Sequence, residues 1–583
     1  MHVTVRGVLS RIEQATPGIQ VARGYRRRWL RTDLIAGVTI VAILIPQGIA
    51  YSELAGAAPV AGLYTAFAAM IAYAFFASSP QLMVGPESGN AILVAATLAP
   101  LVAGNPSRYV SLAAMLALMV GTLLLIGGIA RLAFIANFLS KPILIGYING
   151  ASLIIIASQL GKLFGIKLTT QNFFPALWEL MTHLNQAQWL TFGIGIILIA
   201  LIAALRRFVP KAPSALIAVV LATLASALFQ LDMHGVTVLG DIPAGLPIPR
   251  LPGISFDDIG LLLPGAFGLA LVTFADTILT GRAFATKNGY ELDAGHELIA
   301  IGAANISSGF FQGFTCSASQ SRTAVNDQAG GKTQLTGIVA AILVAVFLLF
   351  LSPLLRNLPQ VALAAIILVA AVSLIDVTSI RRLYHIQPIE AYLAMATTLG
   401  VLVMGILPGL AAAVILDLLV VIWMLARPHD TVLGVIEGID GYHGIRPDTN
   451  TETEPGLIAY RFDAPLFFGN ADYFLSQVRT LTHAPEPPLQ WFLLDAEGIH
   501  ALDTTAAEML RTLILELQQQ GVVFVMARAN TALRNMLTSN ELTGLIGPEH
   551  FFPTVTTGVR AYRERLAHHE REEIAPTMEG ADD

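Results

Sequence analysis

The chain has 583 residues, of which 55% are hydrophobic and 13% charged, and its formal net charge is −6. Soluble domains carry roughly 25% charged residues, so this composition excludes an ordinary soluble protein and indicates a chain that lies in lipid. The charge balance predicts no nucleic-acid partner. The only cysteine, Cys316, excludes an internal disulfide framework and a cysteine-rich metal site.

Apolar segments recur after an arginine-rich N-terminal part, residues 1–32, which we expect to be cytoplasmic. A membrane helix needs about 20 mostly apolar residues. We predict roughly twelve to fourteen such segments, some slightly shorter, in a transmembrane domain over residues 33–427. The clear segments cover residues 34–50, 60–77, 111–130, 133–160, 189–205, 214–229, 261–280, 335–355, 361–377, 391–406 and 410–425. Two further intervals, 81–99 and 314–327, are too polar to score well.

The positions of lysine and arginine predict the orientation of the chain. These residues favour cytoplasmic loops, so three basic loops fall on the same side as the N-terminus. They contain Arg206, Arg207 and Lys211, then Arg282 and Lys287, and then Arg381 and Arg382. An even number of crossings follows, and we expect both termini on the cytoplasmic side of the cell inner (plasma) membrane.

The first apolar segment has a polar step at its centre, in the stretch AILIPQGIAYSELAG. Pro46 must kink or interrupt a helix there, because proline has no amide hydrogen to donate. Gln47 and Tyr51 are four residues apart and therefore lie on one helix face. They are candidates to bind a substrate, although a kinked helix with a purely structural polar step fits the same pattern.

The first polar interval reads QLMVGPESGNAILVAATLAPLVAG. Gly85 and Pro86 break the segment, and a short helix can start at Ser88 and run through Pro100. Glu87 lies directly before this helix. It is either an acidic residue stabilised by the helix N-terminus or a carboxyl group that is protonated together with the substrate. The residues leave both interpretations open.

The stretch FADTILTGRAF places Asp276 and Thr280 on one helix face. Their oxygens suit a hard cation such as sodium, and the carboxylate also suits a proton. A helix end at which Asp276 pairs with a lysine or an arginine is the alternative.

The second polar interval, FTCSASQSRTAVND, holds a permanent cation, Arg322, among hydroxyl side chains. Ionisable groups at membrane depth usually mark a pathway or a site. A half-helix that begins near Ser319 would add free N–H groups. This interval therefore predicts an anion-binding site, called the anion seat below, which also includes Ser321 and Thr323. Two short interrupted segments in the two halves of a chain are typical of a transporter's binding site. The alternative is a loop with an ordinary snorkelling arginine.

The composition changes after Arg427. Residues 428–455 are polar and read as a linker, whereas residues 456–566 alternate strand-like and helical stretches and predict a small α/β domain. Among them, QWFLLDAEG is typical of a buried strand, and DTTAAEMLRTLILELQQQG of a capped helix. We expect the charged tail, residues 567–583, to be disordered.

Five motifs of the chain, taken in order, resemble those of the SulP family of anion transporters. They are IPQGIAYSELAG, VGPES, GDIPAGLP, ELIAIGAANISSGFFQGF and SRTAVNDQAGGKTQ. Residues 456–566 look like the STAS domain that ends these proteins, so the resemblance spans nearly the whole chain. It implies an α-helical polytopic membrane protein of about fourteen segments, in two inverted repeats of seven that form core and gate domains.

The resemblance also implies where the substrate lies. It would bind between the two half-helices and opposite the first helix, at Gln47, Tyr51, Glu87, Ser88, Ser319, Ser321, Arg322 and Thr323. Asp276 and Thr280 match positions of the sodium site in the cyanobacterial bicarbonate member. Relatives such as prestin carry an apolar residue in place of Glu87, so their chloride site does not transfer unchanged.

The STAS domain resembles anti-sigma-factor antagonists, which carry a phosphorylated serine in an Asp-Ser-Ser-Gly loop. The matching stretch here, Asp503-Thr504-Thr505-Ala506, has threonines and no glycine. The capped start of a helix explains this loop as well as phosphorylation does.

We therefore predict a secondary active transporter of inorganic anions, with sulfate as the expected substrate and an elevator-like mechanism. The coupled ion is a proton at Glu87 or sodium at Asp276 and Thr280, and we favour the proton. The alternatives are a bicarbonate or dicarboxylate symporter of the same family, or a neutral-solute carrier of the nucleobase type. We expect no cofactor. The sequence contains neither a phosphate-binding loop nor a catalytic triad, so we do not expect an enzyme. A homodimer is implied by the resemblance alone.

Overall fold

The computed structural model describes residue 18 and residues 24–102, 106–131, 140–170, 172–209, 212–242, 244–253, 256–445, 451–483 and 487–574. The chain divides into two compact units, Met1–Asp417 and Leu418–Asp583, and each is described by itself. Most of the predicted N-terminal segment lies outside the described residues, as do residues 575–583 of the predicted tail.

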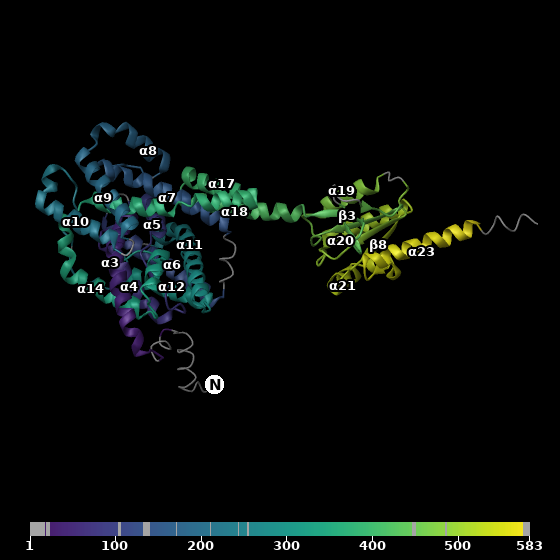
Figure 1. Cartoon of the computed structure of the whole chain (residues 1–583), viewed down its shortest axis with the longest axis horizontal. Helices are drawn as coiled ribbons and strands as arrows, with labels where there is room; N and C mark the ends of the chain where they lie inside the picture. Colours follow the sequence, from purple (N-terminus) through teal and green to yellow (C-terminus); the bar gives the residue numbers. More distant parts are fainter. Residues whose placement is uncertain are drawn as a thin grey trace, which may run out of the picture. The chain divides into compact units, whose positions relative to one another are not determined.

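The first unit contains two successive runs of helices with the same order of elements (Figure 1). The first run is α3 (Leu30–Ala55), α4 (Ala61–Phe76), β1 (Val84–Gly85), α5 (Ser88–Val102), α6 (Pro106–Ile129), α7 (Lys141–Phe164), α9 (Trp189–Phe208) and α10 (Ser214–Phe229). The second is α11 (Phe256–Asn288), α12 (Ala294–Phe310), β2 (Ser317–Ala318), α13 (Gln320–Gln328), α14 (Leu335–Val346), α15 (Gln360–Leu374), α17 (Pro388–Met404) and α18 (Ile406–Ala426). The boundary between the two units falls within α18, after Asp417. Each run has two helices, a two-residue strand, a short helix and four more helices, as the predicted repeats require.

Short elements connect these helices. They are η1 (Arg27–Trp29), α8 (Phe173–Thr182), η3 (Leu184–Gln186), η4 (Leu231–His234), the π-helix η5 (Phe347–Leu351), η6 (Ser352–Asn357) and α16 (Val377–Ile386). The segment predicted over 133–160 begins as a helix only at Lys141, where Pro142 occupies the first turn. Residues 132–139 lie outside the described residues.

The described residues contain 8 helical stretches that are long and apolar enough to cross a membrane, together with the shorter apolar helices α4, α5, α10 and α17. The polar helices α12 and α13 complete the two runs. The apolar segments predicted from the sequence do not include α12, because this helix carries Glu297. The carboxylate of Glu297 is fully buried and accepts hydrogen bonds from Tyr73 Oη (2.5 Å) and Ser78 N (2.9 Å). The polar side of this helix therefore faces protein and not lipid.

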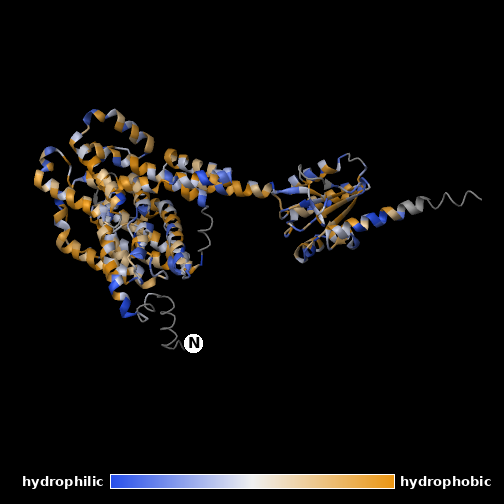
Figure 2. Ribbon diagram, in the orientation of Figure 1, coloured by the Kyte–Doolittle hydropathy of each residue, from blue (hydrophilic) through white to orange (hydrophobic). Residues whose placement is uncertain are grey.

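The exterior of the first unit is apolar, as Figure 2 shows along its helices. On α10, for example, Val220, Leu224 and Leu228 recur every four residues with exposed fractions of 46%, 54% and 77%. Such a stripe would be unfavourable in water. The unit is built to lie in lipid.

The helices of the first unit pack in two groups. The core helices, α3–α6 and α11–α14, pack mainly on one another, and α6 against α12 is the most extensive pairing. The gate helices are α7, α9, α10, α15 and α17, and α7 packs on both α15 and α17. Glycines permit the closest approach, because a Cβ atom on Gly121 would lie 2.6 Å from the carbonyl oxygen of Gly302. The predicted core and gate groups thus have separate packing.

The second unit is an α/β domain built on one mixed sheet. Its strands are β3 (Asp430–Ile436), β4 (Tyr442–Gly444), β5 (Thr451–Glu452), β6 (Leu457–Phe462), β7 (Trp491–Asp495), β8 (Val523–Ala527) and β9 (Phe551–Phe552). The order is β4-β3-β6-β7-β8-β9, with β5 beside β3, and β6 to β9 run parallel. The helices are α19 (Ala471–Thr482), α20 (Thr504–Gln519), α21 (Thr531–Ser539), α22 (Leu542–Ile546), η7 (Pro548–His550) and α23 (Val555–Ile574).

Three strands of this sheet lie within residues 428–455, where the sequence reads as a linker. β3 pairs antiparallel with β6, from Asp430 opposite Phe462 to Leu433 opposite Ala459. The stretch is short and half-buried, so its alternation is too weak to separate it from a polar connection. At the other end, α23 continues to Ile574, into the predicted disordered tail.

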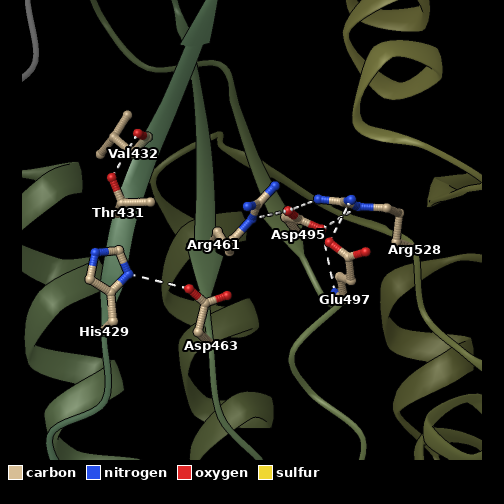
Figure 3. A network of polar contacts seen from close by, with 8 residues as sticks. All are labelled: His429, Thr431, Val432, Arg461, Asp463, Asp495, Glu497 and Arg528. Carbon is tan, nitrogen blue, oxygen red and sulfur yellow. Dashed lines mark hydrogen bonds and ion pairs between the residues drawn. The ribbon is translucent and has the colours of Figure 1, made fainter. Parts of the chain in front are cut away.

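A polar network closes the C-terminal edge of the parallel strands (Figure 3). Asp495 is fully buried at the end of β7 and accepts hydrogen bonds from Arg461 Nε (2.7 Å) and from two nitrogens of Arg528. Arg528 also pairs with Glu497 at 2.6 Å. Carboxylates that surround this guanidinium raise the pKa of Arg528 against the opposing effect of burial.

The loop before α20 is a helix cap. Asp503 Oδ1 accepts a hydrogen bond from Ala506 N at 2.8 Å, and Oδ2 accepts one from Phe468 N at 2.8 Å. Both oxygens of the aspartate are therefore used in the fold, which is the capped helix start considered above.

Candidate functional site

The two interrupted segments meet inside the first unit. β1 and β2 pair antiparallel, with Val84 opposite Ala318 and Gly85 opposite Ser317. Each strand directly precedes a short helix, so the pair brings the N-termini of α5 and α13 together. Irregular backbone survives at membrane depth only when its polar groups are satisfied by protein or by water in a cavity. Here the two segments satisfy each other.

Thr323 on α13 ties the two segments together. Its buried hydroxyl accepts a hydrogen bond from Met83 N (3.0 Å) and donates one to Ser319 O (2.7 Å). Ser319 N in turn donates to Met83 O at 2.9 Å. We predicted Thr323 as a substrate ligand. In this structure its hydroxyl forms hydrogen bonds with backbone groups and links the two segments.

Arg322 lies at the junction and is only 1% exposed. Its Nη1 donates to Gln47 Oε1 at 3.3 Å, and its Nη2 donates to the carbonyl oxygen of Pro86 at 2.9 Å. The buried Nε has no hydrogen-bond partner. Within the described residues, no carboxylate oxygen lies within 4.0 Å of this guanidinium. Its charge is therefore not neutralised by an ion pair.

Gly85 makes room for the guanidinium. Its φ is +150°, and a Cβ atom there would lie 3.4 Å from Arg322 Nη2. A larger residue would therefore strain the backbone and crowd the arginine. Gly85 both interrupts the segment and leaves space for the guanidinium of Arg322.

Glu87 occupies the N-terminus of α5. Its Oε2 accepts hydrogen bonds from Gly89 N (2.8 Å) and from the hydroxyl of Ser88 (3.1 Å). The half-buried carboxylate therefore takes donors that a bound anion would otherwise use. An anion bound at this end of the helix would have to replace the Glu87 carboxylate at these donors.

The remaining predicted ligands are placed as follows. Tyr51 is 4% exposed, and the charges of Glu87 and Arg322 act on its hydroxyl. Ser319 and Ser321 share a hydrogen bond of 3.2 Å between their hydroxyls, and Ser321 is exposed. The structure thus gathers Tyr51 with Arg322 and Glu87, and it leaves the Ser321 hydroxyl at an open position.

Asp276 and Thr280 lie on α11, which packs against α5. The charge of Glu87 acts on Asp276, and the Asn90 amide donates to Thr273 Oγ1 at 2.8 Å, which joins α5 to α11. No lysine or arginine among the described residues pairs with Asp276 within 4.0 Å, so the helix-end alternative lacks its partner. The described part of the chain contains no group of three or more His, Cys, Asp or Glu residues that could hold a metal ion.

A cavity of about 1050 Å³ opens beside the site, between core and gate helices. Its lining includes Glu53 on α3, Ile92 and Ala96 on α5, and Gln159 and Lys162 on α7. None of the predicted ligands lines it, but Ile92 is one helical turn beyond Ser88. Glu53 and Lys162 form an ion pair of 2.9 Å across the boundary between the two groups of helices.

Sequence reasoning did not select Tyr147 on α7. Its hydroxyl is buried without a hydrogen-bond partner among the described residues, and the charges of Asp276 and Glu87 act on it. A lone tyrosine in a long apolar run is usually a packing residue, so no sequence pattern singles it out. Only the approach of α7 to α5 reveals it.

Two half-helices that meet at a buried arginine, which has no carboxylate partner among the described residues, are typical of a membrane transport protein. Residues 30–397 match the sulfate permease family, and residues 448–558 match the STAS domain. The chain belongs to the sulfate permease family, which confirms the SulP resemblance.

Curated relatives agree over nearly the whole chain. A protein of Mycobacterium tuberculosis named "Probable sulfate transporter" is 43% identical over 549 residues, which cover 94% of this chain and 98% of the relative. The "Probable sulfate transporter 4.2" of Arabidopsis thaliana is 31% identical over 558 residues, which cover 92% of this chain and 82% of the relative. The chain is thus a membrane anion transporter and not an enzyme.

Two solved structures support the fold. The murine Slc26a9 anion transporter in its inward-facing state superposes with a TM-score of 0.87 at 22% identity, over 95% of both chains. The transmembrane domain of the cyanobacterial bicarbonate transporter BicA gives a TM-score of 0.58 at 26% identity, over 67% of this chain and 98% of that one. The predicted fold, a helical transport domain followed by a STAS domain, is confirmed.

Proposed function

We propose that this protein is a secondary active transporter that takes up sulfate together with protons. The observation that carries the proposal is the guanidinium of Arg322, which is buried at the meeting point of two half-helices and has no carboxylate partner in the part of the chain that the structure describes. A neutral solute would have no use for this uncompensated charge, whose burial costs several kcal/mol by order of magnitude. The names of the curated relatives support sulfate as the anion.

The bound anion would lie between the N-termini of α5 and α13. Arg322 supplies the fixed charge there, and Gln47, Tyr51, Ser88, Ser319 and Ser321 supply polar contacts around it. Moving the core helices relative to the gate helices would then carry the seat between the two sides of the membrane. This elevator-like step fits the separate packing of the two groups.

Glu87 explains why a proton would accompany the anion. Its ionised carboxylate occupies the first donors of α5 and repels an anion at that position. Protonation removes the charge and releases these donors, so the anion and the proton bind together. The sodium alternative at Asp276 and Thr280 offers ligands from α11 only.

Uptake of labelled sulfate into proteoliposomes tests the proposal, with inward proton and sodium gradients imposed separately. We expect the proton gradient to drive uptake and the sodium gradient to have no effect. Glu87→Gln should bind sulfate and remove the response to the proton gradient, whereas Asp276→Asn should retain that response. Uptake that needs sodium, or that ignores both gradients, would contradict proton coupling.

Competition by unlabelled solutes tests the substrate. Sulfate should compete best, with bicarbonate, dicarboxylates and uracil as the other members of the panel. Preference for bicarbonate would favour the function named for BicA, and competition by uracil would favour a neutral-solute carrier.

Two further proposals concern the membrane in which the protein lies and its oligomeric state. We place the protein in the plasma membrane, with both termini and the STAS domain in the cytoplasm, because the basic loops fall on that side. A reporter fused after residue 583 should be active only inside the cell.

A homodimer is proposed from the family resemblance. The mass of the purified protein in detergent, corrected for bound detergent, tests this proposal.

A further inference from the structure

Tyr147 is a buried tyrosine on a gate helix whose hydroxyl is left without a partner. The residue is 2% exposed, and its Oη is among the buried polar atoms that form no hydrogen bond. Leaving a buried donor unsatisfied costs about 1–3 kcal/mol. A hydroxyl in this position is available to donate a hydrogen bond to a ligand.

The hydroxyl faces the proposed anion seat from the gate side. A Cβ atom built on Gly89 would lie 3.5 Å from Tyr147 Oη and 3.7 Å from Glu87 Oε2, so both groups flank the first turn of α5. Glu87 and Asp276 are the charged groups that act on this hydroxyl, and both come from core helices. The phenol makes no hydrogen bond with Glu87, whose carboxylate accepts from Ser88 and Gly89.

We propose that Tyr147 donates a hydrogen bond to an oxygen of the bound oxyanion and so selects oxyanions over halide ions. This inference rests on the proposed function and adds the gate-side contact of the same site. A tetrahedral oxyanion presents oxygens to opposite sides at once, so it can accept from Arg322 in the core and from Tyr147 in the gate. A halide is a single atom and sits on the core donors alone.

Tyr147→Phe removes only the hydroxyl and keeps the ring. A neutral hydrogen bond contributes about 0.5–1.5 kcal/mol, so the half-saturation concentration for sulfate should rise about 2- to 10-fold. The concentration of chloride that halves sulfate binding, corrected for the sulfate affinity of each variant, should stay unchanged. The matched control is Tyr392→Phe, a tyrosine on gate helix α17 that is 55% exposed, and it should change neither value.

The experiment uses the full-length protein, with binding measured by the sulfate-induced rise in unfolding temperature and by uptake. Equal losses of sulfate and chloride affinity in Tyr147→Phe would overturn the proposal, and so would unchanged affinities. A lower unfolding temperature without ligand would also overturn it, because the structure gives the hydroxyl no internal partner to lose. If the parent protein binds no sulfate, the proposed function fails. If the parent binds sulfate and Tyr147→Phe binds it equally well, only this inference fails.

Discussion

Arg322 and Glu87 set opposite charges at the same seat, and they are held in different ways. The guanidinium is fixed by Gln47 and by the carbonyl of Pro86 and keeps its charge. The carboxylate is held by α5 donors that an anion can replace. In the proposed mechanism, Arg322 supplies the constant attraction and Glu87 binds the coupled proton.

Replacing Arg322 tests the fixed charge. Charge-assisted hydrogen bonds contribute about 1.5–3 kcal/mol each, so Arg322→Ala should lower sulfate affinity roughly ten- to a hundredfold. Arg322→Lys should recover part of the loss, because it keeps a point charge without the planar fork. Binding is measured by sulfate-dependent thermal shift on protein that reaches the membrane in normal amounts. Well-folded Arg322→Ala with unchanged affinity would remove this residue from the site.

At the scale of elements, the site depends on how β1 and β2 hold two helix ends together. Thr323→Val should lower the unfolding free energy by about 1–3 kcal/mol, because it leaves the buried Met83 N–H without its acceptor. Thr336 on α14 is the matched control, since its hydroxyl is fully buried and has no partner. Thr336→Val should be neutral or stabilising in the same thermal unfolding measurement. Equal losses in both variants would mean that the hydroxyl of Thr323 does not hold the junction.

The second unit allows a test of where its domain begins. A fragment over residues 428–574 keeps β3, whereas one over residues 456–574 exposes the edge of β6 that β3 covers. We expect both to show strand and helix signals by circular dichroism, with the longer fragment unfolding at higher temperature. Equal stability would show that β3 to β5 act only as a connection, as the sequence had indicated.

Over the whole molecule, local sequence patterns predicted the ends of helices well, because helix breaks and caps depend on neighbouring residues. Pro86 and Ser88 marked the start of α5, and the polar run before Arg322 marked α13, because breaks and caps act within a few residues. The sequence could not show that Thr323 would be used by Met83 or that Tyr147 would face Glu87. Those relations depend on the packing of helices far apart in the chain, which no local pattern records. The sequence could therefore name residues of the core helices for the proposed site, but it could not name the gate residue Tyr147.

The boundary between core and gate should be controlled by Glu53 and Lys162. Theirs is the one ion pair that joins a core helix to a gate helix in the described part of the chain, and it lines the cavity beside the site. An elevator-like movement would have to break it, because its partners belong to the two groups that move apart. Since their side chains are only 14% and 28% exposed, the pair should favour the state in which the cavity is open by about 1 kcal/mol.

Glu53→Gln and Lys162→Gln should each reduce the open state. The readout is the labelling rate of Ala96→Cys by a membrane-impermeant maleimide, since Ala96 lines the cavity and the native Cys316 is buried. A shift of about 1 kcal/mol should slow labelling by up to about fivefold when the open state is no longer dominant. Arg108→Gln is the control, because its 3.0 Å ion pair with Asp258 joins two core helices and should leave the rate unchanged. Unchanged labelling in both Glu53→Gln and Lys162→Gln would show that the pair does not control the boundary, and faster labelling would show that it holds the cavity closed.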